Sequence, residues 1–394
     1  MKKGKLVSNI VLIGMVSLFV DMSTEMVYPI IPLFLTASLG ATPAIVGVIE
    51  GIAESIASLL KVFSGYIGDV YHNKKRLTFI GYSASVFYKV FLLFASSWVG
   101  VLFARIVDRT GKGIRTAPRD ALVAQSSEKE KLGGSFGLHK MLDMLGSSVG
   151  ALFAFVFVAA NLPYHTAFLW SIIPGVIGVL LISLVREEKE QFQTREKLTL
   201  KGLQLDGRLK LYLLAMFIFC LGNSSNTFLL LKARARGFSA SEVMLLYFIF
   251  NVSASLLAIP SGKISDKFGR KAILVPAYLI FGFVYLGFAI LSSKASVIIL
   301  FIAYGAYTAF ISGAERAFVA EESPAGYKGT VLGIYGMLQG IGLLLSSIIA
   351  GAMWQYVGAD APFWLGGTLG LVSAVVIAVI LGTGKGKSLP EQIQ

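Results

Sequence analysis

The feature that most constrains the fold of this chain is a series of apolar runs, each about as long as a lipid bilayer is thick. A bilayer core is crossed by a helix of roughly 20 apolar residues, and such runs recur along the sequence between short polar breaks. Hydrophobic residues make up 55% of the chain and charged residues only 14%, which excludes an ordinary soluble domain. We therefore predict an all-α membrane protein with twelve transmembrane helices, over residues 6–35, 42–66, 77–96, 98–122, 133–160, 165–185, 209–231, 241–262, 271–293, 295–319, 328–355 and 361–382.

The distribution of lysine and arginine predicts how the spans are oriented. Loops rich in these residues stay in the cytoplasm, because translocation disfavours them. With twelve spans, the N-terminal lysines, the 186–210 segment and the tail after residue 382 share one side, so we expect a cell-membrane protein with both termini in the cytoplasm. The net charge of +13 is then loop charge that faces the lipid bilayer, and we expect no nucleic-acid partner.

A second basic group, formed by Lys232, Arg234 and Arg236, falls on the outer side of the predicted topology. We interpret it as a helix end whose long side chains reach lipid headgroups. An external funnel that attracts a substrate is the alternative.

An internal repeat divides the chain in two. The segment GYIGDVYHNKK begins at Gly65, and the related GKISDKFGRKA begins at Gly262, 197 residues later. An offset of about half the chain predicts duplication of a six-helix unit. We expect two six-helix bundles, at 1–185 and 209–394, joined by a charged cytoplasmic linker at 186–208.

Both copies of this loop carry G-x-x-x-D followed by basic residues. The matching positions are Gly65, Asp69, Lys74 and Lys75 in the first copy and Gly262, Asp266, Lys267, Gly269, Arg270 and Lys271 in the second. Two six-helix halves that carry this motif resemble the major facilitator superfamily. The resemblance implies a transporter that works by alternating access, in which the motif is a gating latch. We expect Gly65 and Gly262 to allow close helix approach, and Arg115 and Arg119 to act as latch partners of Asp69.

Acidic residues lie inside the first two predicted spans, where an ionisable group costs about a few kcal/mol. They form two pairs with four-residue spacing, Asp21 with Glu25 and Glu50 with Glu54, so each pair shares a helix face. Burial and nearby like charges both favour a protonated carboxyl group. The pairs therefore suit proton or cation binding, with neutralisation by buried bases such as Lys61 or Lys89 as the alternative.

The fourth predicted span contains ARIVDRTGKGIRTAPRDALVA, in which charges of both signs alternate. Its charged residues are Arg105, Asp108, Arg109, Lys112, Arg115, Arg119 and Asp120, and we expect most of them to share one face, with Asp108 and Lys112 as a pair. This segment and DMSTEMVYP resemble a group of prokaryotic permeases within the superfamily. The strip is predicted to be either a salt-bridge ladder to Asp69, Asp143 and the second-span glutamates or a binding surface for an anionic substrate. Asp143 is the predicted interior acid of the fifth span.

The second half is mostly neutral at the equivalent positions. Asn223 and Asn226 bound a polar break in the seventh span, where repeat transporters usually place a substrate site. No catalytic or metal-ligand pattern is visible, so we expect neither an enzyme nor a cofactor. The sequence favours proton-coupled export of a small cationic or amphipathic compound by a monomer. A carrier for an anionic metabolite, bound by the fourth-span bases, is the alternative.

Overall fold

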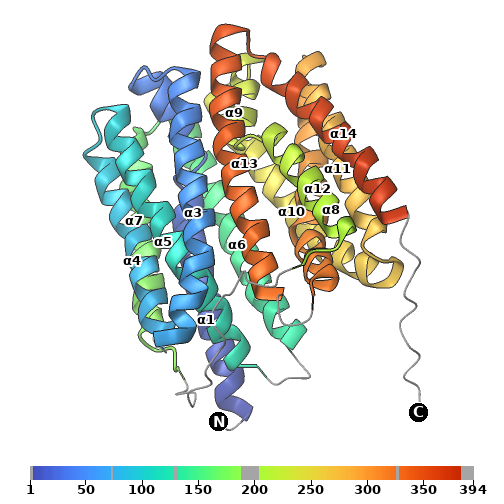
Figure 1. Cartoon of the computed structure of the whole chain (residues 1–394). Coiled ribbons are helices and arrows are strands. Elements are labelled where there is room, and N and C mark those ends of the chain that lie inside the picture. The colour runs from blue at the N-terminus through green and yellow to red at the C-terminus, as the bar shows by residue number, and fades with distance from the viewer. Residues whose placement is uncertain (1–2, 72–73, 128–131, 188–203, 325–327, 383–394) are drawn as a thin grey trace.

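The computed structural model describes residues 3–71, 74–127, 132–187, 204–324 and 328–382, and over these residues it contains helices and no strand (Figure 1). The first half comprises α1 (Lys3–Glu25), α2 (Ile31–Leu33), the π-helical turn η1 (Phe34–Ser38), α3 (Pro43–Tyr71), α4 (Lys74–Leu93), α5 (Trp98–Gln125), α6 (Leu132–Ala159) and α7 (Tyr164–Ile182). The second half comprises α8 (Gly207–Gly222), α9 (Thr227–Ala235), α10 (Ala240–Phe268), α11 (Lys271–Ile290), α12 (Lys294–Glu322), α13 (Lys328–Tyr356) and α14 (Ala361–Gly382).

Every predicted span coincides with one helix or with two or three consecutive helical segments. The first span is formed by α1 together with α2 and η1, and the seventh by α8 together with α9. Within the described residues, nine segments are long and apolar enough to cross a membrane by their length and composition. The predicted all-α membrane fold is confirmed.

The helix boundaries repeat with the offset found in the sequence. Both ends of α10 lie 197 residues after those of α3, and both ends of α11 lie 197 residues after those of α4. The packing repeats as well: α1 contacts α6 and α7 as α8 contacts α13 and α14, and α3 contacts α5 as α10 contacts α12. The two halves meet along α3 with α13 and along α6 with α10, and Figure 1 shows α3 and α13 side by side at the centre.

The first and seventh spans are broken at equivalent depths. In the first span α1 ends at Glu25 and the helix resumes at Ile31, because Pro29 has no backbone N–H to donate. In the seventh span the break covers residues 223–226, which the offset places opposite residues 26–29. The polar break predicted from the asparagines is therefore present, and it has a counterpart in the first half.

Glycines bring the two halves into direct backbone contact. A Cβ atom added to Gly51 of α3 would lie 2.9 Å from the backbone oxygen of Leu344 in α13. One added to Gly351 would lie 2.6 Å from the backbone oxygen of Pro43. These contacts follow α3 from its first residue toward its middle, so small residues set the distance between the halves.

Gly262 does not have the predicted role. A Cβ atom added there would meet nothing within 4 Å, and the glycine is exposed. The reason is a cavity of about 280 Å³ beside α10, to which Gly262, Ser265 and Ala314 contribute. The expectation of a close helix approach at this glycine is wrong for the conformation described.

The basic group formed by Lys232, Arg234 and Arg236 also departs from the prediction of a lipid-facing helix end. The Lys232 side chain is only 2% exposed and pairs with Asp360, which precedes α14. Arg236 binds the same carboxylate at 2.9 Å, and Arg234 donates to the backbone oxygen of Phe238. Lys232 therefore turns inward because an acid and the ring of Phe363 receive its ammonium group.

Candidate functional site

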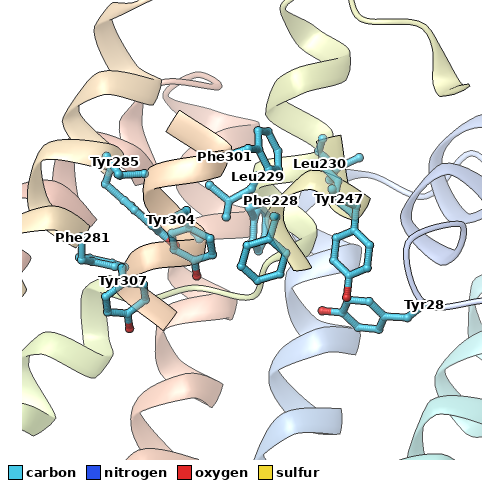
Figure 2. Close-up of a cluster of buried hydrophobic side chains, with 14 of the residues drawn as sticks. Tyr28, Phe228, Leu229, Leu230, Tyr247, Phe281, Tyr285, Phe301, Tyr304 and Tyr307 are labelled. Carbon is cyan, nitrogen blue, oxygen red and sulfur yellow. The ribbon is translucent and has the colours of Figure 1, made fainter. Parts of the chain in front are cut away.

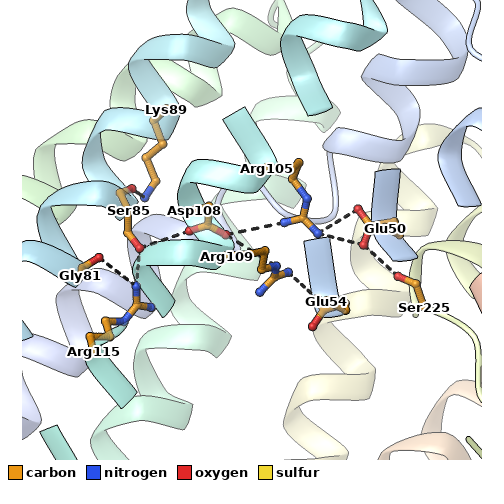
Figure 3. A network of polar contacts seen from close by, with 10 residues as sticks. All are labelled: Glu50, Glu54, Gly81, Ser85, Lys89, Arg105, Asp108, Arg109, Arg115 and Ser225. Atoms are coloured by element: carbon orange, nitrogen blue, oxygen red, sulfur yellow. Dashed lines mark hydrogen bonds and ion pairs between the residues drawn. The ribbon is translucent and has the colours of Figure 1, made fainter. Parts of the chain in front are cut away.

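A buried ion pair joins the second and fourth spans. Arg105 of α5 donates from one Nη atom to both carboxylate oxygens of Glu50 in α3, at 2.8 and 2.9 Å, and Figure 3 shows the two side chains pointing toward each other. The exposed fractions of the two side chains are 0% and 2%. A buried charge is tolerated when it is paired and hydrogen-bonded. Each of these side chains therefore offsets the cost of burying the charge of the other.

Asp108 lies at the centre of the α5 charges. Its Oδ2 atom is 3.8 Å from nitrogen atoms of both Arg105 and Arg109, and its Oδ1 atom accepts a hydrogen bond of 3.2 Å from Ser85 of α4. Arg115 in turn contacts the Ser85 hydroxyl (Figure 3). The network therefore continues from α5 into α4, which the sequence did not predict.

Arg109 extends the network to the second glutamate of α3. Its Nη2 atom lies 2.8 Å from Glu54, whose side chain is 24% exposed, whereas that of Arg109 is 4% exposed. Tyr28, in the break of the first span, places its ring 5.3 Å from the guanidinium of Arg105 and 5.7 Å from that of Arg109. This ring covers both arginines on one side and contributes cation–π attraction.

The two glutamates of α3 are thus neutralised by arginines of the fourth span. Lys89 does not take part in an ion pair with a described residue: it donates to the backbone oxygen of Ser85 at 2.5 Å and lies over the ring of Tyr88. The side chain of Lys61 lies outside the described residues. The salt-bridge ladder is therefore present for the second-span glutamates, with bases other than the lysines that we considered.

Lys112 does not form the ion pair with Asp108 that its spacing predicts. Asp108, four residues earlier, faces Arg105 and Arg109 instead. The Lys112 side chain is exposed, makes no ion pair within the described part of the chain, and lies close enough to Glu25 and Glu54 for their charges to interact. It is the most accessible base of the strip.

Two hydrogen bonds between side chains join the halves among the residues that the structure describes. Tyr247 of α10 donates to Glu25 at 2.7 Å, and Ser225 donates to Glu50 at 2.9 Å (Figure 3). Both acceptors are carboxylates predicted for proton coupling. No feature of the sequence pointed to Tyr247, whereas Ser225 lies inside the predicted polar break.

Glu25 has a different environment from the glutamates of α3. It is half-buried at the end of α1, and no described lysine or arginine lies within ion-pair distance of it. Its described hydrogen-bond partner is Tyr247, whose ring also packs on Tyr28 with the ring centroids 5.8 Å apart. Among the described residues this carboxylate therefore lacks the ion-pair partner that Glu50 and Glu54 have.

The remaining acids of the strip lie between α1 and α6. The carboxyl groups of Asp21 and Asp143 lie close enough for their charges to interact, and Lys140 binds Asp143 at 2.7 Å. The glycines of α6 make this approach possible, because a Cβ atom added to Gly150 would lie 2.9 Å from the Cβ atom of Glu25. Asp143 is thus placed beside the first-span acids and away from Arg105.

The asparagines of the seventh-span break face aromatic residues of α12. Asn223 donates to the hydroxyl of Tyr307 at 3.1 Å, and Asn226 accepts from Tyr304 at 2.8 Å. Figure 2 shows both tyrosines within a group of rings that also contains Phe281. The two amides are therefore held by the second half and do not join the charged network.

The predicted latch is only partly covered by the structure. The side chains of Gly65, Asp69 and Asp266 lie outside the described residues. The other predicted members make local contacts. The backbone amides of Lys74 and Lys75 donate to Glu187, and Arg119 binds Asp120 at 2.9 Å. In the second copy, Gly269 ends α10 with a φ of 83°, Arg270 binds Glu321 at 2.7 Å, and Lys271 is the exposed first residue of α11. Arg115, expected to bind Asp69, contacts Ser85 and the backbone oxygen of Gly81.

Comparison with known proteins gives a consistent result over the whole chain. A sequence profile described as Major Facilitator Superfamily matches residues 13–230 and 211–392. An uncharacterized MFS-type transporter of Methanocaldococcus jannaschii is 32% identical over 383 residues, which is 95% of this chain and 96% of that protein. A tetracenomycin C resistance and export protein of Streptomyces glaucescens is 23% identical over 34% of this chain and 25% of its own length.

The fold has close counterparts among solved structures. A POT family transporter, solved in complex with 5-aminolevulinic acid, superposes with a TM-score of 0.79 at 13% identity. The superposition covers 94% of this chain and 95% of that one. At this level of identity the likeness is one of fold.

Proposed function

The chain belongs to the major facilitator superfamily and is a multi-pass membrane transporter, and we propose that it exchanges a small cationic or amphipathic compound for protons by alternating access. The two bundles, at 1–185 and 209–394 with a linker at 186–208, move against each other along the α3–α13 and α6–α10 contacts. The transporter acts as a monomer with both termini in the cytoplasm. Its proton-binding groups are Glu25 and the Asp21–Asp143 pair.

The observation that carries this proposal is the hydrogen bond from Tyr247 to Glu25 across the two halves. A hydrogen bond to an ionised acceptor is roughly twice as strong as one between neutral groups. Protonation of Glu25 therefore weakens the contact between α1 and α10. Proton binding and the separation of the two halves are in this way linked through one carboxyl group.

The absence of a positive partner makes Glu25 the best proton acceptor of the three glutamates. Arg105 and Arg109 form direct ion pairs with Glu50 and Glu54. No described base does this for Glu25. The neighbouring carboxyl groups of Asp21 and Asp143 form the second proposed proton site, because like charges at close range disfavour ionisation of both groups.

Two features support a cationic or amphipathic substrate and export. Deprotonated Glu25 carries a negative charge, and an organic cation can neutralise this charge in place of the proton. Tyr28 and Tyr247 provide aromatic faces beside it. The similarity to the tetracenomycin C export protein favours outward transport, although it covers one third of this chain.

An anionic substrate is the second candidate, and Lys112 is the observation in its favour. This ammonium group is exposed on the face of α5 that carries Arg109, and it is free of ion pairs with described residues. An anion bound there would give Lys112 the ion-pair partner that it lacks among the described residues. The two candidates differ in the sign of the transported charge.

Transport into lipid vesicles tests the proposal. The purified protein is reconstituted, a pH gradient is imposed, and uptake of a panel of cationic and anionic dyes is measured. We expect cationic dyes to accumulate against their gradient and Glu25→Gln to abolish this accumulation while downhill exchange continues, because the variant keeps an acceptor for Tyr247 but cannot exchange a proton.

Glu242→Gln is the matched control, since Glu242 is an exposed glutamate that pairs with Lys294. It should transport like the unchanged protein. Accumulation of anionic dyes that is lost in Lys112→Gln and kept in Glu25→Gln would contradict the proposal and establish the second candidate.

A further inference from the structure

A buried carboxyl group lies in the second half, away from the charged strip. Glu315 of α12 is 5% exposed. Its Oε1 atom accepts a hydrogen bond from the hydroxyl of Tyr278 in α11, and its Oε2 atom accepts one of 2.5 Å from Tyr335 in α13. The side-chain amide of Gln339, also in α13, lies 3.3 Å from Oε2. Donors from the two neighbouring helices α11 and α13 therefore converge on one carboxylate of α12.

The surroundings of Glu315 contain donors but no ion-pair partner among the described residues. Arg316 follows it in α12, but its side chain is exposed and makes no ion pair with it. The other titratable groups that face it are uncharged at neutral pH: Tyr278 from α11, Tyr335 from α13, Tyr212 and Cys220 from α8, and Tyr307 from α12 itself. An ionised carboxylate without a base is costly inside a membrane protein, whereas three donors offset part of that cost.

We propose that Glu315 is a second proton-binding site and that its protonation rearranges the contact between α12 and α13. This site is separate from Glu25 and from the charges of α5, and it does not depend on them. Its ligand is a proton taken from water, which stays on the carboxyl group, and no other bond is made or broken.

The hydrogen bonds around the carboxylate must change when the proton arrives. In the ionised form Tyr335 donates to Oε2 and accepts a hydrogen bond of 2.5 Å from Gln339. A proton on Oε2 gives this atom an O–H group that can donate to the Tyr335 oxygen 2.5 Å away. Tyr335 must then turn its own proton away from Glu315, and Gln339 must turn its oxygen toward that proton to keep the hydroxyl satisfied.

This rearrangement reaches the contact between the two halves. Gln339 is followed by Gly340, and a Cβ atom added to Gly340 would lie 2.8 Å from the Cβ atom of Ser58 in α3. Rotation of the Gln339 side chain therefore takes place next to Gly340, which is packed directly against α3. Proton binding at Glu315 is expected to bias the α3–α13 contact and with it the access equilibrium.

Infrared difference spectroscopy tests the site without knowledge of the substrate. The full-length protein in lipid vesicles is stepped between acidic and alkaline pH, and the carbonyl stretching band of protonated carboxyl groups is recorded. We expect a band that Glu315→Gln removes and that Tyr335→Phe moves to higher frequency, because the acid loses a hydrogen-bond partner.

Matched variants keep this test decisive. Glu322→Gln, in the same helix but partly exposed and paired with Arg208, should leave the band unchanged. Glu315→Asp keeps the carboxyl group and should shift the band without removing it, which covers the case in which the glutamine variant does not fold. Survival of the full difference spectrum in Glu315→Gln would overturn the proposal, and persistence of the Glu315 band in Glu25→Gln separates this site from the proposed coupling group.

The link to the access equilibrium has its own measurement. Spin labels at Arg76→Cys and Lys267→Cys, both exposed, report the distance between the two halves at the α3–α4 and α10–α11 ends. The distance distribution should depend on pH, and Glu315→Gln should remove part of that dependence. An identical pH dependence with and without the substitution would show that the site does not act on the α3–α13 contact.

Discussion

The two halves of this transporter share one arrangement of helices, but their buried polar side chains have different kinds of partner. In the first half, Glu50, Glu54 and Asp108 contact the guanidinium groups of Arg105 and Arg109. In the second half, Glu315 and the seventh-span asparagines are held by tyrosine hydroxyls. The helix packing is the same in both, so the difference lies in the side chains that face the inside. The two copies of the repeat therefore share the positions of their helices and differ in the polar side chains that these helices carry.

The repeat also explains how the halves recognise each other. The offset of 197 residues places Tyr247 opposite Glu50 and Ser225 opposite Tyr28. Glu50 bonds Ser225, and the equivalent residues Tyr247 and Tyr28 pack their rings together. One contact is polar and its counterpart aromatic. The interface is therefore symmetric in position and asymmetric in chemistry. The carboxylates that accept the two described hydrogen bonds between the halves, Glu25 and Glu50, both belong to the first half.

The largest effect that separates the halves is expected when the buried ion pair is broken. Glu50→Ala removes the closest partner of Arg105, in a position with no solvent access, and breaking a buried ion pair in this way destabilises a protein by about 3–5 kcal/mol. Thermal unfolding of the purified protein should register this as a large loss of stability. Changing both residues, Glu50→Ala with Arg105→Met, should recover most of it, because no uncompensated charge remains. Equal losses in the single and double variants would contradict this view of the network.

The sequence predicted the fold better than the pairing of charges. The spans and the repeat depend on local composition and on a constant offset, both of which are visible in the chain. The choice of Arg105 for Glu50, 55 residues away, depends on how α3 and α5 are rotated about their axes, which hydropathy does not specify. Lys232 was misinterpreted for the same reason, because Asp360 lies 128 residues from it. Gly262 failed as a predicted contact because a shared motif does not fix the distance between helices.

A smaller effect is expected from two glycines in equivalent helices. Gly51→Val adds side-chain atoms where α3 meets α13, and overpacking of this kind costs about 1–3 kcal/mol. Gly262→Val adds the same atoms to α10, where a Cβ atom has no neighbour within 4 Å. The first variant should lower the unfolding temperature and widen the spin-label distances between the halves, and the second should change neither. Similar losses in both would indicate that α10 is as closely packed as α3 in another access state.

The smallest expected effect concerns an ion pair that the second half has and the first half lacks. Arg270 binds Glu321 at 2.7 Å, while the offset places Ala124 opposite Glu321, so the first half has no equivalent acid. The two side chains are 24% and 53% exposed, and such partly solvated pairs contribute about 0.2–1 kcal/mol. Glu321→Gln should therefore change thermal stability little, and less still at high salt, where exposed charges are screened. If the pair belongs to the predicted latch, the same substitution should shift the ratio of the two access states by at most about fivefold, since 1.4 kcal/mol corresponds to tenfold. Spin-label distances at low and high salt measure that ratio, and a shift well beyond this limit would mean that the pair acts together with groups such as Asp266.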